Sequence, residues 1–114
     1  MKISPPDPGL LSLNSATVRE KRSLREMIEG CSRAGDKRLL AFHICDWFVP
    51  TTDLLLDRGM MGDGIIDLPL VRSWMETAGY RGFHEVEIFS ARNWWKREPD
   101  DVLDVMKRRH QECC

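Results

Sequence analysis

The sequence has few of the features that mark membrane, secreted or nucleic-acid-binding proteins. No apolar run approaches the roughly 20 residues of a membrane-spanning helix, and the first stretch, MKISPPDPGLLSLNS, lacks the apolar core of a signal peptide. The formal net charge is only -1, so bulk electrostatics indicate neither nucleic acid nor an anionic membrane as a partner. These absences favour a cytoplasmic protein.

The four cysteines have neither the number nor the spacing of a disulfide scaffold or of a C-x-x-C zinc pair. We therefore expect reduced thiols, which are usual in the cytosol. Cys113 and Cys114 stand at the end of the sequence and are expected to fray. For that reason His110 and Cys114 are not favoured as a metal-binding pair.

The residues that are present are typical of a single soluble globular domain. Of the 114 residues, 42% are apolar and 31% are charged, which does not fit a disordered chain. Residues 1–16 are rich in proline and are predicted to be irregular. Residues 17–114 are predicted to be the folded part.

Beyond residue 16 the chain alternates between helical and strand patterns. Apolar periodicity, helix-capping residues and short apolar runs mark the elements. They are a helix over residues 17–34, a strand over 38–45, a loop over 46–66, a helix over 67–78, a strand over 84–90 and a last helix that opens at Pro99. Repeated β/α alternation predicts parallel strands.

Two strands are too few for a β/α fold in which both faces of the sheet are covered. A closed (β/α)8 barrel typically takes about 250 residues, and this chain has 114. The sequence is therefore interpreted as part of a larger β/α fold.

Two candidate site residues lie near the C-terminal ends of the predicted strands, His43 on the first and Glu87 on the second. Functional groups gather at these ends in β/α barrels, and adjacent parallel strands would bring the two side chains close together. An imidazole and a carboxylate are half of a site for a divalent metal ion. Glu85 points to the same side of its strand as Glu87 and either pairs with an arginine or supports the site.

Several short motifs follow one another in a specific order: LLAFHICDW (39–47), DRGMMGDGIIDLPLVRSWMETAGYRG (57–82), HEVEIFS (84–90) and NWWKREPDDVL (93–103). In this order they resemble the C-terminal portion of the sugar phosphate isomerase/epimerase family, the xylose isomerase-like TIM barrels. The resemblance runs from about Leu24 to Gln111. It implies an α/β fold, a partial (β/α)8 TIM barrel of about the last two β/α units plus the preceding helix.

The resemblance also implies a metal-dependent reaction. Carboxylates move a proton through an enediol while a divalent metal stabilises the developing oxyanion. His43 matches the histidine ligand of the family, and Glu87 matches the last glutamate, which is both a ligand and the acid or base. The implied cofactor is Mn, Mg, Zn or Co.

On the substrate side, Arg58 matches an arginine that contacts substrate oxygens or phosphate, a role that suits its planar donors. An ion pair with Asp53 or Asp57 is the alternative for Arg58. Asp46 lies where a substrate-binding or supporting group is usual.

Aromatic and turn residues complete the candidates. Trp94 and Trp95 either pack in the core or wall a sugar site, and Trp95 is the candidate for substrate binding. Asp63, within Gly-Asp-Gly, is interpreted as part of a turn rather than as catalytic, since the glycines permit a tight turn.

The family's other metal ligands and its second catalytic glutamate have no match, because no predicted strand ending in Glu or Asp precedes Arg38. The chain is therefore interpreted as a metal-dependent sugar or sugar phosphate isomerase/epimerase-type protein. It would be an incomplete fragment, inactive on its own, that binds metal weakly if at all.

The alternative is a non-catalytic interaction module whose exposed strand edges pair with another chain. An abasic-site endonuclease of similar structure gains no support from the net charge. The expected partners are a sugar or sugar phosphate and either a second copy of the chain or a complementing N-terminal half. Nucleic acid and membrane are not expected.

Overall fold

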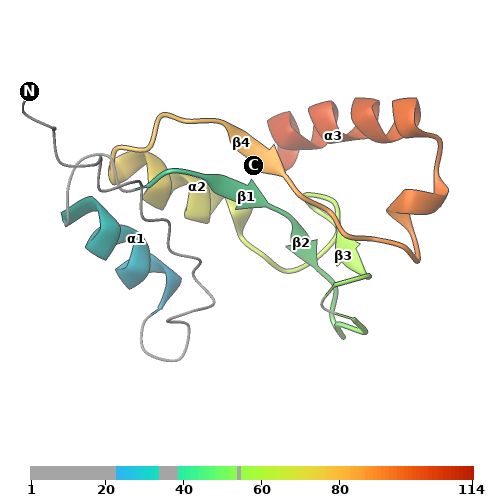
Figure 1. Cartoon of the computed structure of the whole chain (residues 1–114), viewed down its shortest axis with the longest axis horizontal. Helices are drawn as coiled ribbons and strands as arrows, with labels where there is room; N and C mark the ends of the chain where they lie inside the picture. The colour runs from blue at the N-terminus through green and yellow to red at the C-terminus, as the bar shows by residue number, and fades with distance from the viewer. Residues whose placement is uncertain (1–22, 34–38, 54) are drawn as a thin grey trace, which may run out of the picture.

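The computed structural model describes residues 23–33, 39–53 and 55–114, with only the backbone described for residues 31–33. The predicted irregular segment 1–16 and both ends of the predicted helix over 17–34 lie outside these residues. The elements are α1 (Leu24–Arg33), β1 (Phe42–Ile44), β2 (Asp46–Trp47), β3 (Arg58–Gly59), α2 (Leu68–Thr77), β4 (His84–Val86), the 3₁₀ helix η2 (Trp94–Lys96) and α3 (Pro99–Cys113). This order follows the predicted β/α alternation (Figure 1).

The two predicted strands pair with each other. β1 and β4 run parallel, with Phe42 opposite His84 and Ile44 opposite Val86, and they lie side by side in Figure 1. The connection between them passes through α2, which gives the chain the length that a parallel crossover needs. The predicted α/β character and parallel pairing are therefore confirmed.

The connection predicted as a loop over residues 46–66 contains a small second sheet. β2 and β3 pair antiparallel, with Asp46 opposite Gly59 and Trp47 opposite Arg58. Strands of two residues are too short to show an alternating pattern, so no periodicity marks them in the sequence. The pairing brings Arg58 back beside the chain that follows β1.

The two later helices begin where the sequence predicts. The side chain of Asp67 accepts a hydrogen bond of 3.1 Å from the backbone N–H of Leu70, and Pro69 lies in the first turn of α2. After α2, Gly79 has a φ of +97°, a conformation that glycine adopts without strain. α3 begins at Pro99, with two aspartates in its first turn that interact favourably with the helix dipole.

The two faces of the β1–β4 pair differ. Phe42 and Ile44 are buried on one face, in a core shared with all three α-helices. The other buried apolar residues of this core are Ile28, Met60, Met61, Leu68, Met75, Tyr80 and Trp94. His43, between the two buried residues of β1, points to the opposite face and is exposed. Within the described residues, the core lies between the sheet and the helices and leaves this second face open.

The expected fraying of Cys113 and Cys114 is wrong. α3 continues to Cys113, and both cysteines pack against the core. Arg109 donates a hydrogen bond of 3.0 Å to the carbonyl oxygen of Met61, and Arg72 donates one of 3.0 Å to that of Cys114. These two contacts tie the end of α3 to the β3–α2 loop and to α2.

The structure also bears on the cysteines and on the search for a membrane-spanning segment. Cys45, Cys113 and Cys114 are free thiols. Among the described residues, no helix has the length and apolar character needed to cross a membrane.

Candidate functional site

Three ionisable side chains meet on the open face of the β1–β4 pair. His43 Nε2 lies 2.6 Å from Glu85 Oε2, and His43 Nδ1 lies 3.6 Å from Glu87 Oε2. Their side chains are 53%, 55% and 43% exposed. The strand register explains the meeting, because His43 is paired with Glu85 and the N–H of Glu87 donates to the carbonyl of Ile44 at 2.9 Å. We call His43, Glu85 and Glu87 the open-face cluster.

Arg58 reaches the open-face cluster from β3. Its Nη1 atom lies 3.4 Å from Glu87 Oε2, and only 18% of its side chain is exposed. Its guanidinium carbon lies 4.8 Å from the centre of the Phe89 ring, and its backbone N–H donates to the Phe89 carbonyl at 2.9 Å. Contacts with the segment after β4 therefore hold both the backbone and the side chain of Arg58 beside Glu87.

The two aspartates considered as alternative partners of Arg58 have roles within their own turn. Asp53 Oδ1 accepts hydrogen bonds from the backbone N–H groups of Leu55 at 2.8 Å and Leu56 at 2.9 Å. These bonds lower the pKa of Asp53. The hydroxyl of Thr52 donates a hydrogen bond to Asp57. Both carboxylates thus stabilise the turn that precedes β3.

Asp46 lies away from the open face and is buried, with 1% of its surface exposed. Its carboxylate accepts hydrogen bonds of 2.8, 3.1, 2.8 and 3.0 Å from the backbone N–H groups of Trp47, Gly62, Gly64 and Ile66. Gly64 approaches so closely that an added Cβ would lie 2.0 Å from the Trp47 carbonyl oxygen. Asp46 therefore holds the β3–α2 loop in place, and its contact with substrate stays a prediction.

Asp63 also acts within this loop. Its Oδ2 atom accepts hydrogen bonds from the Met60 N–H at 2.9 Å and from the indole N–H of the buried Trp94 at 2.8 Å. Its Oδ1 atom lies 3.3 Å from Arg109 Nη1. The turn interpretation of Asp63 agrees with the first contact. The other two join the loop to η2 and α3, and sequence reasoning missed them because their partners are distant in the chain.

Trp95 lies at the surface, 57% exposed, in contrast to the buried Trp94. Its indole N–H donates to the Ile88 carbonyl at 2.9 Å, and its ring meets Phe89 edge-on at 6.0 Å between centroids. Phe89 in turn lies against Arg58. An aromatic surface thus adjoins the cation beside the open-face cluster. Substrate binding by Trp95 stays a prediction.

The donor set of the open-face cluster suits a divalent metal. One ring nitrogen of His43 faces Glu85 and the other faces Glu87. A carboxylate on the far nitrogen of a histidine ligand is a common feature of metal sites, because it fixes the tautomer and the ring orientation. Nitrogen and oxygen ligands of one ion lie about 3 to 3.5 Å apart, so the 3.6 Å between His43 Nδ1 and Glu87 needs only a small closure.

Comparison with known proteins gives a family and a related structure. A family model described as xylose isomerase-like TIM barrel matches residues 14–109. The crystal structure of protein SMc04130 from Sinorhizobium meliloti 1021 is similar to 78% of this chain, with 53% sequence identity and a TM-score of 0.70. The chain spans 33% of the length of that protein. Comparison with curated proteins finds no match.

Proposed function

Because the chain belongs to the xylose isomerase-like TIM barrel family, we propose that it forms about the last two β/α units and the preceding helix of such a barrel. Its open-face cluster would act in the metal-dependent isomerisation or epimerisation of a sugar or sugar phosphate. The convergence of His43, Glu87 and Arg58 on the open face carries this proposal. In a closed barrel that face would point inward, where the strand ends carry the chemistry.

His43 and Glu87 would hold the metal, which is Mn, Mg, Zn or Co. When bound, such an ion acts as a Lewis acid toward the sugar oxygens. Glu85 would keep His43 in the tautomer whose Nδ1 offers a lone pair, since its carboxylate accepts from the opposite ring nitrogen.

Glu87 would also move the proton. Its carboxylate takes a proton from the carbon next to the sugar carbonyl and returns it to the enediol. Arg58, 3.4 Å from Glu87, would bind a substrate oxygen or a phosphate close to that carboxylate. Phe89 and Trp95 would pack against the C–H surface of the sugar, because both rings lie partly exposed beside Arg58.

The structure favours a supporting role for Asp46. Four backbone N–H groups surround its carboxylate, which leaves little capacity for a substrate hydroxyl. Asp46 would thus position the loop that leads from Arg58 to α2.

This half-site needs further ligands. Among the described residues, the open-face cluster offers one imidazole and two carboxylates, and the Glu85 carboxylate is already engaged by Nε2 of His43 at 2.6 Å. We propose that an N-terminal half of the barrel, or a second copy of the chain, supplies the other ligands and the second acid or base.

Proton exchange is the direct test. The chain is supplied with Mn²⁺ and a panel of aldoses, ketoses and their phosphates in D₂O, alone and mixed with the part of the S. meliloti protein that it does not cover. We expect loss of the sugar C–H signal only in the mixture, and none with Glu87→Gln. Glu98→Gln, an exposed acid outside the site, is the matched control. A mixture that binds Mn²⁺ through His43 but exchanges no sugar proton would refute the proposal.

A non-catalytic interaction module is the second candidate. β1 and β4 form a sheet of two strands, so each has an outer edge without a strand partner in the described part of the chain. Such edges pair readily with another chain. Size-exclusion chromatography tests this reading, because a concentration-independent monomer would argue against pairing between copies.

A further inference from the structure

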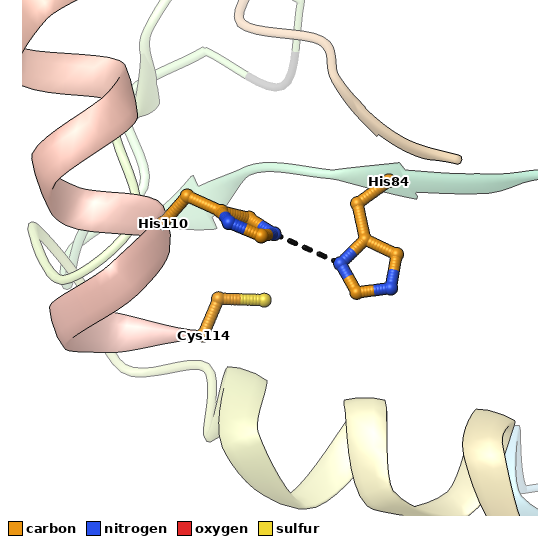
Figure 2. A group of neighbouring side chains, drawn as sticks. All are labelled: His84, His110 and Cys114. Carbon is orange, nitrogen blue, oxygen red and sulfur yellow. Dashed lines mark hydrogen bonds between the residues drawn. The ribbon is translucent and has the colours of Figure 1, made fainter. Parts of the chain in front are cut away.

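A second group of metal-binding residue types lies on the helix-covered side of β4. His84 opens β4, His110 lies near the end of α3, and Cys114 follows that helix. One nitrogen of each histidine and the sulfur of Cys114 all lie within 4.8 Å of one another. Figure 2 shows the three side chains turned toward a common space. We call them the His84 cluster.

Neighbouring residues hold the His84 cluster in place. The ring of His84 stacks on Tyr80, with 6.5 Å between centroids and 20° between planes. Its Nδ1 atom lies 2.9 Å from Nε2 of His110, the contact dashed in Figure 2. Arg72 donates a hydrogen bond of 3.0 Å to the carbonyl of Cys114 and so fixes the backbone that carries the thiol. The ligand atoms are thus brought together before any ion binds.

The protonation states of the cluster are compatible with metal binding. Burial, reinforced by Arg72 and His110, lowers the pKa of His84, so its ring is neutral near pH 7 and offers a lone pair. Burial raises the pKa of the Cys114 thiol, which therefore keeps its proton until a cation displaces it. The nearby charge of Arg72 is offset by Glu76, whose Oε1 atom lies 2.8 Å from Arg72 Nε.

We propose that His84, His110 and Cys114 bind a Zn²⁺ ion at a site separate from the open-face cluster. Two imidazoles and a thiolate are ligands that tetrahedral zinc prefers. Two nitrogen ligands of tetrahedral zinc lie about 3.3 Å apart, so the facing rings need to separate by only a few tenths of an ångström from 2.9 Å.

Proton balance is simple at this site. In the metal-free cluster, one of the two facing ring nitrogens carries a proton. When the ion binds, that nitrogen loses its proton, and the far nitrogen of the same ring carries one instead. The thiol of Cys114 loses its proton to solvent, so one proton is released for each ion bound.

A water molecule would complete the tetrahedron. His84 and His110 both line a hollow at the surface, which gives solvent access to the fourth position. Cys113 is not the fourth ligand, because its sulfur is turned toward Gly62, where an added Cβ would lie 2.7 Å from it. The ion would join the end of α3 to the start of β4 and so stabilise the fold, without a role in the proposed sugar chemistry.

A cobalt titration of the chain tests the site. Co²⁺ replaces zinc and gives a thiolate-to-cobalt charge-transfer band. We expect one Co²⁺ per chain with this band, and displacement by Zn²⁺. Because even supporting residues of a metal site contribute about 10-fold or more to affinity, Cys114→Ser and His110→Gln should each weaken Zn²⁺ binding at least about 10-fold. Cys114→Ser should also abolish the band. Cys113→Ser is the matched control and should keep both the band and the affinity.

Three results would overturn the proposal: no thiolate band in the folded chain, an equal loss with Cys113→Ser and Cys114→Ser, or loss of the band with His43→Ala. The last variant also separates this site from the proposed function. His43→Ala removes a residue of the open-face cluster and should leave cobalt binding at the His84 cluster unchanged.

Discussion

The two histidine clusters lie on opposite sides of the same short strand, because His84 and Glu85 are neighbours in β4. The open-face cluster is half exposed and surrounds its imidazole with carboxylates. In the His84 cluster, the ring of His84 lies against the rings of Phe42 and Tyr80, and Cys114 supplies a thiol. Carboxylate oxygens suit Mn²⁺ or Mg²⁺, whereas imidazole with thiolate suits Zn²⁺. Because side chains alternate between the two faces of a strand, two adjacent residues of β4 belong to two clusters with different ligand types.

The two clusters differ in how much of their surroundings the described part of this chain provides. The open-face cluster is exposed because no described element covers that side of the sheet, as expected if the remaining barrel strands come from elsewhere. The His84 cluster is partly buried between β4 and the end of α3, and this chain supplies all three of its residues. We therefore expect the first site to need complementation and the second to form in the isolated chain.

The β3–α2 loop links the two regions. It begins after Gly59, and its backbone N–H groups donate hydrogen bonds to the Asp46 carboxylate, which holds it in place. Its other side touches α3, where Arg109 donates to the Met61 carbonyl and Cys113 lies against Gly62. Damage to this loop should therefore reach both clusters.

Gly64→Ala should produce the largest loss of stability and should disturb both clusters at once. An added Cβ would lie 2.0 Å from the Trp47 carbonyl and 2.7 Å from Asp46 Oδ1, so the backbone must shift and the Asp46 hydrogen bonds must break. We expect a loss of at least about 3 kcal/mol in the free energy of unfolding, measured by urea denaturation. Zn²⁺ binding should weaken as well.

Gly79→Ala is the matched control for this variant. Gly79 has a positive φ, but an added Cβ would meet nothing within 4 Å, so the cost should be about 1 to 2 kcal/mol of backbone strain. If Gly64→Ala destabilised the protein no more than Gly79→Ala, the role given to the Asp46-held loop would be wrong.

Glu85→Gln should have a smaller effect that is confined to the open face. The amide cannot hold His43 as the carboxylate does, so Mn²⁺ affinity at this cluster should fall about 10-fold, measured by calorimetry in the complemented mixture of the proton-exchange test. Because the pair is half exposed, the free energy of unfolding should change by less than about 1 kcal/mol. Unchanged Mn²⁺ affinity would contradict the supporting role of Glu85, and weaker Zn²⁺ binding at the His84 cluster would contradict the separation of the two sites.

The smallest effect is a pH dependence specific to the His84 cluster. Burial, Arg72 and His110 lower the pKa of His84 from the usual 6.5, while Glu76 acts in the opposite direction. The unfolded chain therefore binds a proton more readily than the folded one, and stability should fall as the pH drops below 6.5 toward the folded pKa. Urea unfolding at several pH values measures this slope. His84→Gln should flatten it, and an unchanged slope would remove His84 as the cause.

Much of the fold could be predicted from local signals. The cap formed by Asp67, the glycine after α2 and the proline that opens α3 are each encoded within a few residues. The parallel pairing followed from the β/α alternation, and the strand ends correctly pointed to His43 and Glu87 as neighbours. The β2–β3 pairing could not be predicted, because two-residue strands have no period.

The long-range contacts of the sites were also not predictable. The contact of Glu85 with His43 depends on the strand register, and the burial of Asp46 depends on how the β3–α2 loop folds back. His84 joins His110 and Cys114 only because α3 returns to β4, a packing that sequence spacing does not encode. The i, i+4 spacing of His110 and Cys114 was the one available signal, and the expected fraying concealed it.

The most direct test of the account uses the fact that the chain has three histidines. The side-chain ¹H–¹⁵N spectrum of His43, His84 and His110 is recorded during separate titrations with Mn²⁺ and Zn²⁺. We expect paramagnetic Mn²⁺ to broaden His43 first, and Zn²⁺ to shift His84 and His110 together at a lower metal concentration. Equal broadening of all three rings by Mn²⁺, or Zn²⁺ shifts at His43 before His84, would contradict the assignment of two distinct metal sites.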